Sequence, residues 1–257
     1  MHLSWRKKDF NEDLDFILFT QRDGNTEFWR KKLFDAYPDL NYEYAKSLAQ
    51  DSRFEYITQQ MKVQARKRES DIENAIKIFQ ASWDQTIAPQ LNDAYSSAFD
   101  NDCANILNDM VGEVGLNPIC PRNIRNRSFA LYHFFDSQYS MTLALHEITH
   151  FVWFYFWKKH FNDDITEYDF PNIKWLLSEI IVETIIRNSE INDLIKMPKY
   201  IAYYYFYDMN INGALIFDTQ KELYLTRKNI YDFMEKSFDW IKNNELELRR
   251  KIADAEK

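Results

Sequence analysis

The sequence predicts a mainly α-helical protein of the α+β class, a helical bundle in which a small sheet or edge strand precedes one long apolar helix. Only four Gly and six Pro occur in 257 residues, so few turns can interrupt long helices. Hydrophobic residues make up 46% of the chain and aromatic residues 17%, enough for a large core. Half of the glycines lie in one short region, which is where we expect the strand.

Residues 1–100 are expected to form a helical N-terminal region. A charged segment around Phe28 ends at the break Tyr37-Pro38-Asp39. Apolar residues then recur at helical spacing in two stretches: Ile57 and Met61, followed by Ile72, Ile76 and Phe79. Pro89 predicts an interruption after them. No recognisable chemistry lies in this region.

Residues 101–257 are expected to form the metal-binding region, packed with the first region as one globular unit. Gly and Pro cluster between Asp100 and Asp136, which marks the least helical part of the chain. The segment from Ser128 to Phe135 is short and aromatic and ends before Asp136-Ser137. This pattern predicts a β-strand.

Two apolar helices are expected to follow the strand. The segment from Ser140 to His160 contains neither Gly nor Pro, and its length favours a buried helix over a strand. Pro171-Asn172 begins the second, which runs from about Ile173 to Asn188. An aromatic segment, Tyr200 to Tyr207, then leads to a last amphipathic helix, about Thr219 to Ala255.

Charge and composition exclude several classes of partner. The net charge of −8 argues against a nucleic-acid binder, because phosphate binding needs a concentrated cationic surface. The longest apolar runs are too short to cross a bilayer, so we expect no membrane partner. Two cysteines, Cys103 and Cys120, give no disulfide framework, which favours the cytoplasm. The sequence leaves the oligomeric state open.

The segment His146-Glu147-Ile148-Thr149-His150 carries the most specific chemistry. Residues four apart share a helix face, so His146 and His150 can point at one ion. Zinc accepts imidazole nitrogens in tetrahedral geometry. Glu147 is offset by about 100° around the helix, which places it beside the ion as a general base. The alternative is a pair of core histidines, which would leave the Glu147 carboxylate buried at a cost of several kcal/mol.

A third ligand is expected on the next helix. Glu179 and Glu183 share a face among Leu, Ile and Val residues, where like charges repel unless a cation lies nearby. A dication held by the histidines would resolve the repulsion, with Glu179 as the ligand. Glu183 would then accept a hydrogen bond from a ligand imidazole. The alternative is that Glu183 pairs with Arg187 one turn later while Glu179 is solvated.

At this point the sequence resembles the gluzincins, zinc peptidases with two histidines of one helix and a glutamate of a later helix as ligands. The resemblance covers roughly residues 125–190. It implies a zincin-like core with one Zn²⁺. The matching residues are the ligands His146, His150 and Glu179, the general base Glu147, and Glu183 as the acidic residue four after the ligand.

The resemblance also implies a place for substrate. Gluzincins hold an extended peptide on an edge strand before the active-site helix, and Ser128 to Phe135 occupies the corresponding place. They also carry a Tyr or His that stabilises the oxyanion. Candidates for that residue are His160 and the tyrosines Tyr200, Tyr203, Tyr204, Tyr205 and Tyr207.

The function expected from the sequence is zinc-dependent hydrolysis of amide bonds in a peptide or protein substrate, with Glu147 as general base. One alternative is a catalytically silent metal-binding protein with a regulatory or interaction role on the same scaffold. A second is a helical structural protein without a metal.

Overall fold

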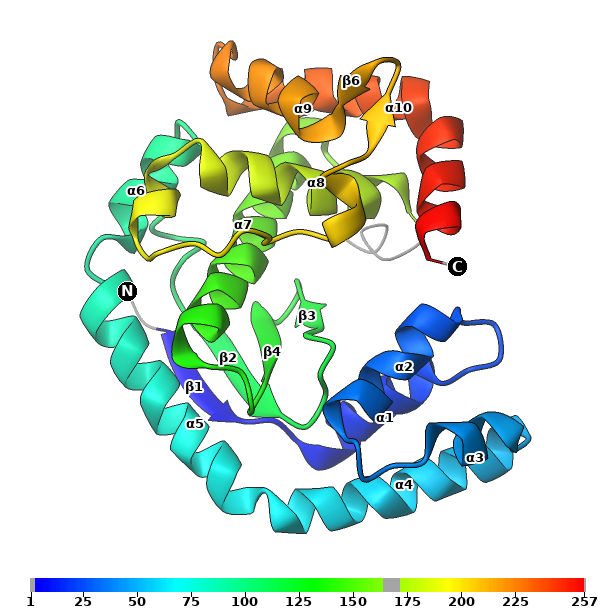
Figure 1. Ribbon diagram of the computed structural model, residues 1–257. Coiled ribbons are helices and arrows are strands. Elements are labelled where there is room, and N and C mark those ends of the chain that lie inside the picture. Colours follow the sequence, from blue (N-terminus) through cyan, green and yellow to red (C-terminus); the bar gives the residue numbers. More distant parts are fainter. Residues whose placement is uncertain (1–2, 164–171, 257) are drawn as a thin grey trace.

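The computed structural model describes residues 3–163 and 172–256, which form a mainly helical structure with a small mixed sheet (Figure 1). This confirms the predicted α+β class. The zincin-like core stays a prediction. The helices wrap around the sheet and around α7, which runs through the middle of the molecule (Figure 1).

The sheet combines strands from both ends of the first half of the chain. Its order is β1-β2-β4-β3; β1–β2 and β2–β4 are parallel, and β3–β4 is antiparallel. The strands are β1 (Leu3–Lys7), β2 (Met110–Gly115), β3 (Arg122–Asn123) and β4 (Ser128–Tyr132). The chain therefore begins with a strand where we expected helix, and that strand belongs to the sheet of the second region.

The expected strand Ser128–Phe135 exists, but it has a different place in the sheet. It ends at Tyr132, and it lies between β2 and β3 instead of at an edge. The edge beside it is the two-residue strand β3. Its partner β4 is fully buried, because both of its neighbours and the helices cover it.

A close aromatic contact holds the first strand in place. Trp5 of β1 lies opposite Gly112 of β2, and Gly112 lies opposite Phe129 of β4. A Cβ atom on Gly112 would lie 2.5 Å from the Trp5 ring. Trp5 also packs edge-on against Phe79 of α5 and against Phe129. Only a residue without a side chain fits beneath this indole.

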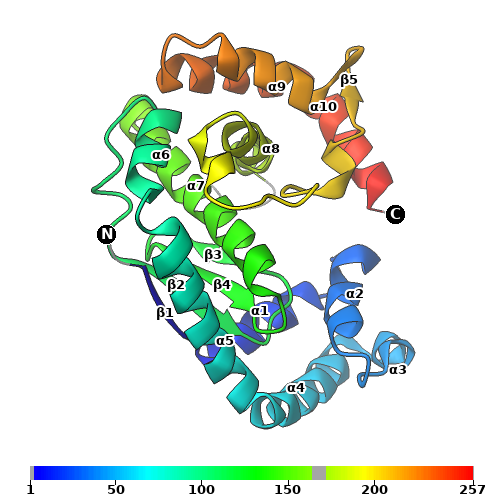
Figure 2. The same ribbon diagram turned by 60° about the vertical axis from the view of Figure 1, so that its left-hand side comes forward.

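The N-terminal helices form an arc around the sheet (Figures 1 and 2). They are α1 (Phe10–Thr20), α2 (Glu27–Ala36), α3 (Tyr42–Ser47), α4 (Gln50–Lys67), α5 (Glu69–Ser82) and α6 (Leu91–Ala98). Asp9 caps α1 by accepting hydrogen bonds from the backbone of Asn11 and Glu12. A π-helical turn (Trp83–Ile87) and the turn at Pro89 separate α5 from α6, as expected.

A buried carboxyl joins α1 to the end of β2. Asp13 is 2% exposed, and its Oδ2 accepts hydrogen bonds from the backbone of Leu116 at 2.5 Å and Asn117 at 3.2 Å. Burial raises the pKa of Asp13 to about 6, against the lowering effect of those hydrogen bonds.

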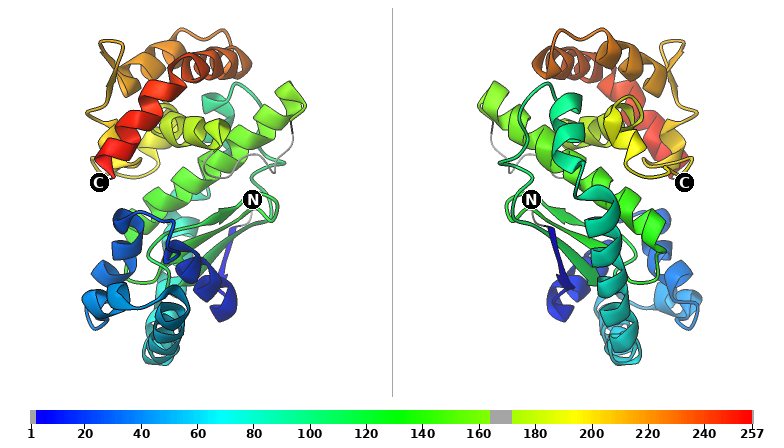
Figure 3. Two further views of the ribbon diagram at one scale, coloured as in Figure 1. Left: turned by 90° about the vertical axis from the view of Figure 1, so that its right-hand side faces the viewer. Right: turned by 90° about the vertical axis from the view of Figure 1, so that its left-hand side faces the viewer.

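Helix α7 (Ser137–Phe161) confirms the expected long buried helix. Asp136 caps its first turn by accepting from the backbone of Tyr139, and Asn162 ends it in the left-handed conformation (φ 51°). In Figure 3 α7 crosses over the sheet, and Phe151 on its inner face contacts Phe129 of β4.

Helix α8 (Ile173–Arg187) packs against α7 and confirms the second apolar helix. Asn172 caps it by accepting from the backbone of Lys174. Pro171, which we expected to begin this element, lies outside the described residues.

The C-terminal part covers α8 (Figure 1). It contains the short helical turns η3 (Glu190–Asp193) and η4 (Tyr204–Phe206), the hairpin strands β5 (Asn210–Ile211) and β6 (Ala214–Leu215), and the helices α9 (Ile216–Leu225) and α10 (Ile230–Ala255). The single helix expected from Thr219 to Ala255 is therefore two helices, because Asn229 begins α10 as a new cap. Among the described helices, none has the length and apolar character to cross a membrane.

Candidate metal centre

Helix α7 presents three of the predicted site residues together. His146, Glu147 and His150 are 7%, 5% and 0% exposed. One helical turn separates the two imidazoles, and their Nε2 atoms lie 3.1 Å apart. Two ring nitrogens at this distance share either a proton or a bound cation.

Glu179 of α8 completes the group of ligand atoms, with a different carboxylate oxygen toward each imidazole. Its Oε2 lies 3.5 Å from Nε2 of His146, and its Oε1 lies 3.4 Å from Nε2 of His150. Tetrahedral ligands about 2.0–2.1 Å from zinc stand about 3.3 Å from one another. Each nearest contact is close to that value, and one ligand atom from each residue lies within 4.8 Å of the others. The buried residues His146, His150 and Glu179 are therefore a group that could hold a metal ion.

His150 and Glu179 have the protonation states that bind a cation, whereas the neighbouring carboxylates, acting against burial, raise the pKa of His146. Burial lowers the pKa of His150 to about 3, which keeps this imidazole neutral and its lone pair available. Burial opposes ionisation of Glu179, but His150 and Arg122 outweigh it and hold the pKa of this carboxyl well below its usual range. The Nδ1 atoms of His146 and His150 have no hydrogen-bond partner among the described residues.

Arg122 is a member of the site that the sequence did not reveal. It lies in the edge strand β3, and its Nη1 donates to Glu179 Oε1 at 2.9 Å and contacts Glu147 Oε2 at 3.5 Å. Its side chain is 12% exposed, and Nη2 is buried without a partner in the described part of the chain. The expected repulsion between buried carboxylates is thus relieved in part by a guanidinium.

Glu147 faces this guanidinium from α7. Burial raises the pKa of Glu147, although Arg122 acts in the opposite direction. The carboxylate therefore lies beside the ligand group without belonging to it, as the 100° offset from His146 predicts.

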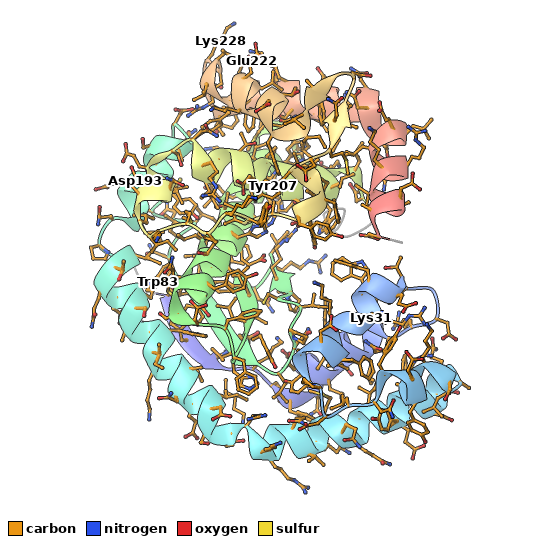
Figure 4. The ribbon with its side chains drawn as sticks, viewed as in Figure 1. Lys31, Trp83, Asp193, Tyr207, Glu222 and Lys228 are labelled. Atoms are coloured by element: carbon orange, nitrogen blue, oxygen red, sulfur yellow. The ribbon has the colours of Figure 1, made fainter. Side chains whose placement is uncertain are left out.

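Glu183 forms the pair with Arg187 that was the alternative expected for it, although Glu179 is buried and not solvated. Its Oε1 accepts from Arg187 Nε at 2.8 Å, and its Oε2 accepts from the Tyr207 hydroxyl at 2.5 Å. Neither imidazole Nδ1 is bonded to it in the described structure. Figure 4 places the half-buried Tyr207 beside α8.

The candidates for an oxyanion-stabilising residue have different contacts in the structure. Tyr207 is bonded to Glu183, and His160 pairs with Glu235 at 2.8 Å near the far end of α7. Burial raises the pKa of Tyr203 well above its usual value, and the negative charge of Glu179 raises it further. Besides burial, the same carboxylate also raises the pKa of Tyr205. Tyr203 also contacts Trp29 of α2, with ring centroids 5.9 Å apart.

Fold and site together define a mainly helical α+β protein with a buried His-His-Glu group that could hold a metal. No protein-family model matches the chain, and no match is found among curated proteins or solved structures. The geometry of the site itself must therefore carry any conclusion about function.

Proposed function

We propose that this protein is a zinc-dependent peptidase. The observation that carries the proposal is the cluster of ligand atoms: the two Nε2 atoms lie 3.1 Å apart, and each is 3.4–3.5 Å from a different oxygen of the Glu179 carboxylate. One ligand atom from each of the three residues lies within 4.8 Å of the others, and a four-coordinate zinc held by them would take its fourth ligand from water or substrate. Zinc in such a site lowers the pKa of water and polarises a carbonyl.

Glu147 is the general base in this proposal. Its carboxylate adjoins the ligand group, so it can take a proton from the attacking water and deliver it to the leaving amine. Arg122 holds the Glu147 and Glu179 carboxylates in fixed positions through Nη1. Tyr203 is the candidate donor to the oxyanion, since its hydroxyl experiences the charges of both Glu179 and Glu147.

The substrate class follows from the sheet. Strand β3 is an edge strand of the described sheet, and Arg122 connects it directly to the site. An extended peptide could add to this edge as a further strand. In that position the peptide would lie next to Glu147. A peptide or protein is therefore the proposed substrate.

The test combines zinc analysis with cleavage of a peptide library. We expect one zinc per chain and cleavage that Glu147→Gln reduces by at least a hundredfold, because removal of a general base costs about 10²–10⁴. Glu113→Gln is the matched control, since Glu113 is also buried but pairs with Arg6 and Lys8 of the sheet. Full activity of Glu147→Gln would refute the proposed role.

The second candidate is a catalytically silent metal-binding protein with a regulatory or interaction role. The burial of the ligand group favours this candidate, because all three of its residues are at most 7% exposed and a substrate would have to reach them. Bound zinc without cleavage of any library peptide would select this candidate. A metal-free structural protein remains the third, and it requires Arg122 alone to balance the site carboxylates.

A further inference from the structure

A surface pocket lies beside the C-terminal half of α7. Its volume is about 330 Å³, and its wall contains no acidic side chain. The lining residues are the cationic Arg125, Arg127, Lys158 and Lys159 and the apolar or aromatic Ile106, Ile124, Phe151 and Tyr155. None of them belongs to the metal centre.

The cations of this pocket come from two separate elements. Arg125 and Arg127 lie in the turn between β3 and β4, where Asn123 Oδ1 accepts from the backbone of Asn126 and fixes the turn. Arg127 Nη1 donates to the backbone carbonyl of Asn108 at 2.8 Å, which holds its side chain in place. Lys158 and Lys159 extend from the last turn of α7.

The acidic residues in the described part of the chain leave these positive charges unpaired. Within residues 3–163 and 172–256, no salt bridge involves Arg125, Lys158 or Lys159. The two lysines also offset the dipole at the end of α7. The helix dipole does not account for the two arginines, because they lie in a turn. Four cations around one concavity, in a chain of net charge −8, indicate an anionic ligand.

We propose that this pocket binds a small molecule with two or more phosphate charges and a flat ring, of the nucleoside diphosphate class. A guanidinium group can donate two parallel hydrogen bonds to the oxygens of one phosphate, and a lysine ammonium adds a compact positive charge. Tyr155 is 40% exposed at the wall and can stack on a ring, while Ile106 and Ile124 supply apolar contacts. The volume lies in the range of small-ligand pockets.

The net charge favours a small ligand over a polynucleotide. A long strand would leave the pocket and run over a surface that carries the rest of the 40 acidic and 32 basic residues. The site is also independent of the proposed peptidase activity, because it shares no residue with the metal centre.

The test is calorimetric titration of the full chain with ADP, pyrophosphate, adenosine and a single-stranded oligonucleotide, each with and without a chelator. We expect ADP to bind most tightly, pyrophosphate more weakly and adenosine least. The double variant Arg125→Ala/Lys158→Ala should weaken ADP at least tenfold. Lys221→Ala/Arg250→Ala is the control, since it removes equal charge from exposed positions elsewhere.

Three outcomes would overturn the proposal. The first is that neither ADP nor pyrophosphate binds at millimolar concentration. The second is an equal loss of ADP affinity in the control variant, which would mean a general effect of charge. The third is binding of the oligonucleotide alone. Binding of ADP that survives the chelator would separate this site from the metal centre, whatever the result of the peptidase assay.

Discussion

His146 and His150 hold their Nε2 atoms 3.1 Å apart inside the protein, and a metal is the ligand that would use both. We expect excess zinc to stabilise the protein by about 4 kcal/mol once free zinc is a thousandfold above its Kd. His146→Ala should abolish this gain, measured as the shift in Tm between zinc and chelator. His160→Ala should keep it, because His160 pairs with Glu235. An equal zinc shift in both variants would contradict the site.

Arg122 supplies the positive charge that the sequence argument assigned entirely to a metal. In chelator, Arg122→Met should lower the free energy of unfolding by about 3–5 kcal/mol, because it leaves Glu147 and Glu179 buried without their partner. Zinc should restore much of this loss, since a dication replaces the guanidinium. Urea unfolding with and without zinc measures both effects.

The control for this experiment is Arg125→Met, which changes an exposed arginine of the following turn. It should alter stability by less than about 0.5 kcal/mol. A loss in Arg122→Met that zinc leaves unchanged would show that Arg122 stabilises the fold in some way unrelated to the ligand group.

Asp13 should make stability depend on pH between about 4 and 6. Its folded pKa of about 6 exceeds the ordinary 3.8, so the folded state binds the proton more tightly. The stabilisation is present below pH 4 and is lost as the pH rises through 6, by about 3 kcal/mol. Asp13→Asn does not titrate, so wild-type stability should fall relative to this variant over that interval. A constant difference from pH 4 to 7 would exclude the effect.

Sequence reasoning succeeded for the residues whose neighbours are local. His146, Glu147 and His150 are related by helix geometry, which spacing alone fixes. Arg122 is different, because it reaches the site only through the short antiparallel pairing of β3 with β4. No local pattern encodes that pairing. The pairing of Glu183 with Arg187 is also local and was one of the expected alternatives, whereas the contact of Glu183 with Tyr207 depends on the folded C-terminal segment.

At the scale of elements, long apolar helices were predictable and short or interrupted elements were not. Helices α7 and α8 contain no helix breaker and lie within three residues of their expected limits. Strand β1 has only five residues, and its pairing partner is about a hundred positions away. The break between α9 and α10 contains neither Gly nor Pro, so the cap Asn229 was its only signal.

The contact between β1 and β2 gives a test of the sheet. Gly112→Ala should destabilise the protein by about 1–3 kcal/mol, because the new methyl group would overlap the Trp5 ring. Gly24→Ala is the matched control, since no atom lies within 4 Å of a Cβ at that position. Urea unfolding measures the free energy of unfolding of both variants. Equal stability would mean that the indole can move aside.

At the scale of the whole molecule, α2 touches the C-terminal part through aromatic rings next to the metal centre. Phe28 contacts Tyr204, and Trp29 contacts Tyr203, whose hydroxyl experiences the charge of Glu179. Figure 1 shows α2 facing this part across the open side of the arc. We expect access to the candidate metal centre from this side to depend on separating these rings.

Trp29→Ala should accelerate the release of zinc to a chelator several-fold, because it removes one of these contacts. Stopped-flow measurement with a chromogenic chelator gives the rate. Phe19→Ala is the control, since Phe19 is 48% exposed on α1. Identical release rates in wild type and Trp29→Ala would place the path of the ion elsewhere.

The pairing of β1 with β2 also governs how the chain acquires its structure. The salt bridge between Arg6 and Glu113 joins positions 107 residues apart. During translation β1 leaves the ribosome long before β2 has been synthesised. It therefore stays unpaired while the intervening helices form. Such distant pairing is entropically costly and slow. Until β2 arrives, Leu3 and Trp5 are exposed on a strand with open edges, which is the state that chaperones bind and in which aggregation begins.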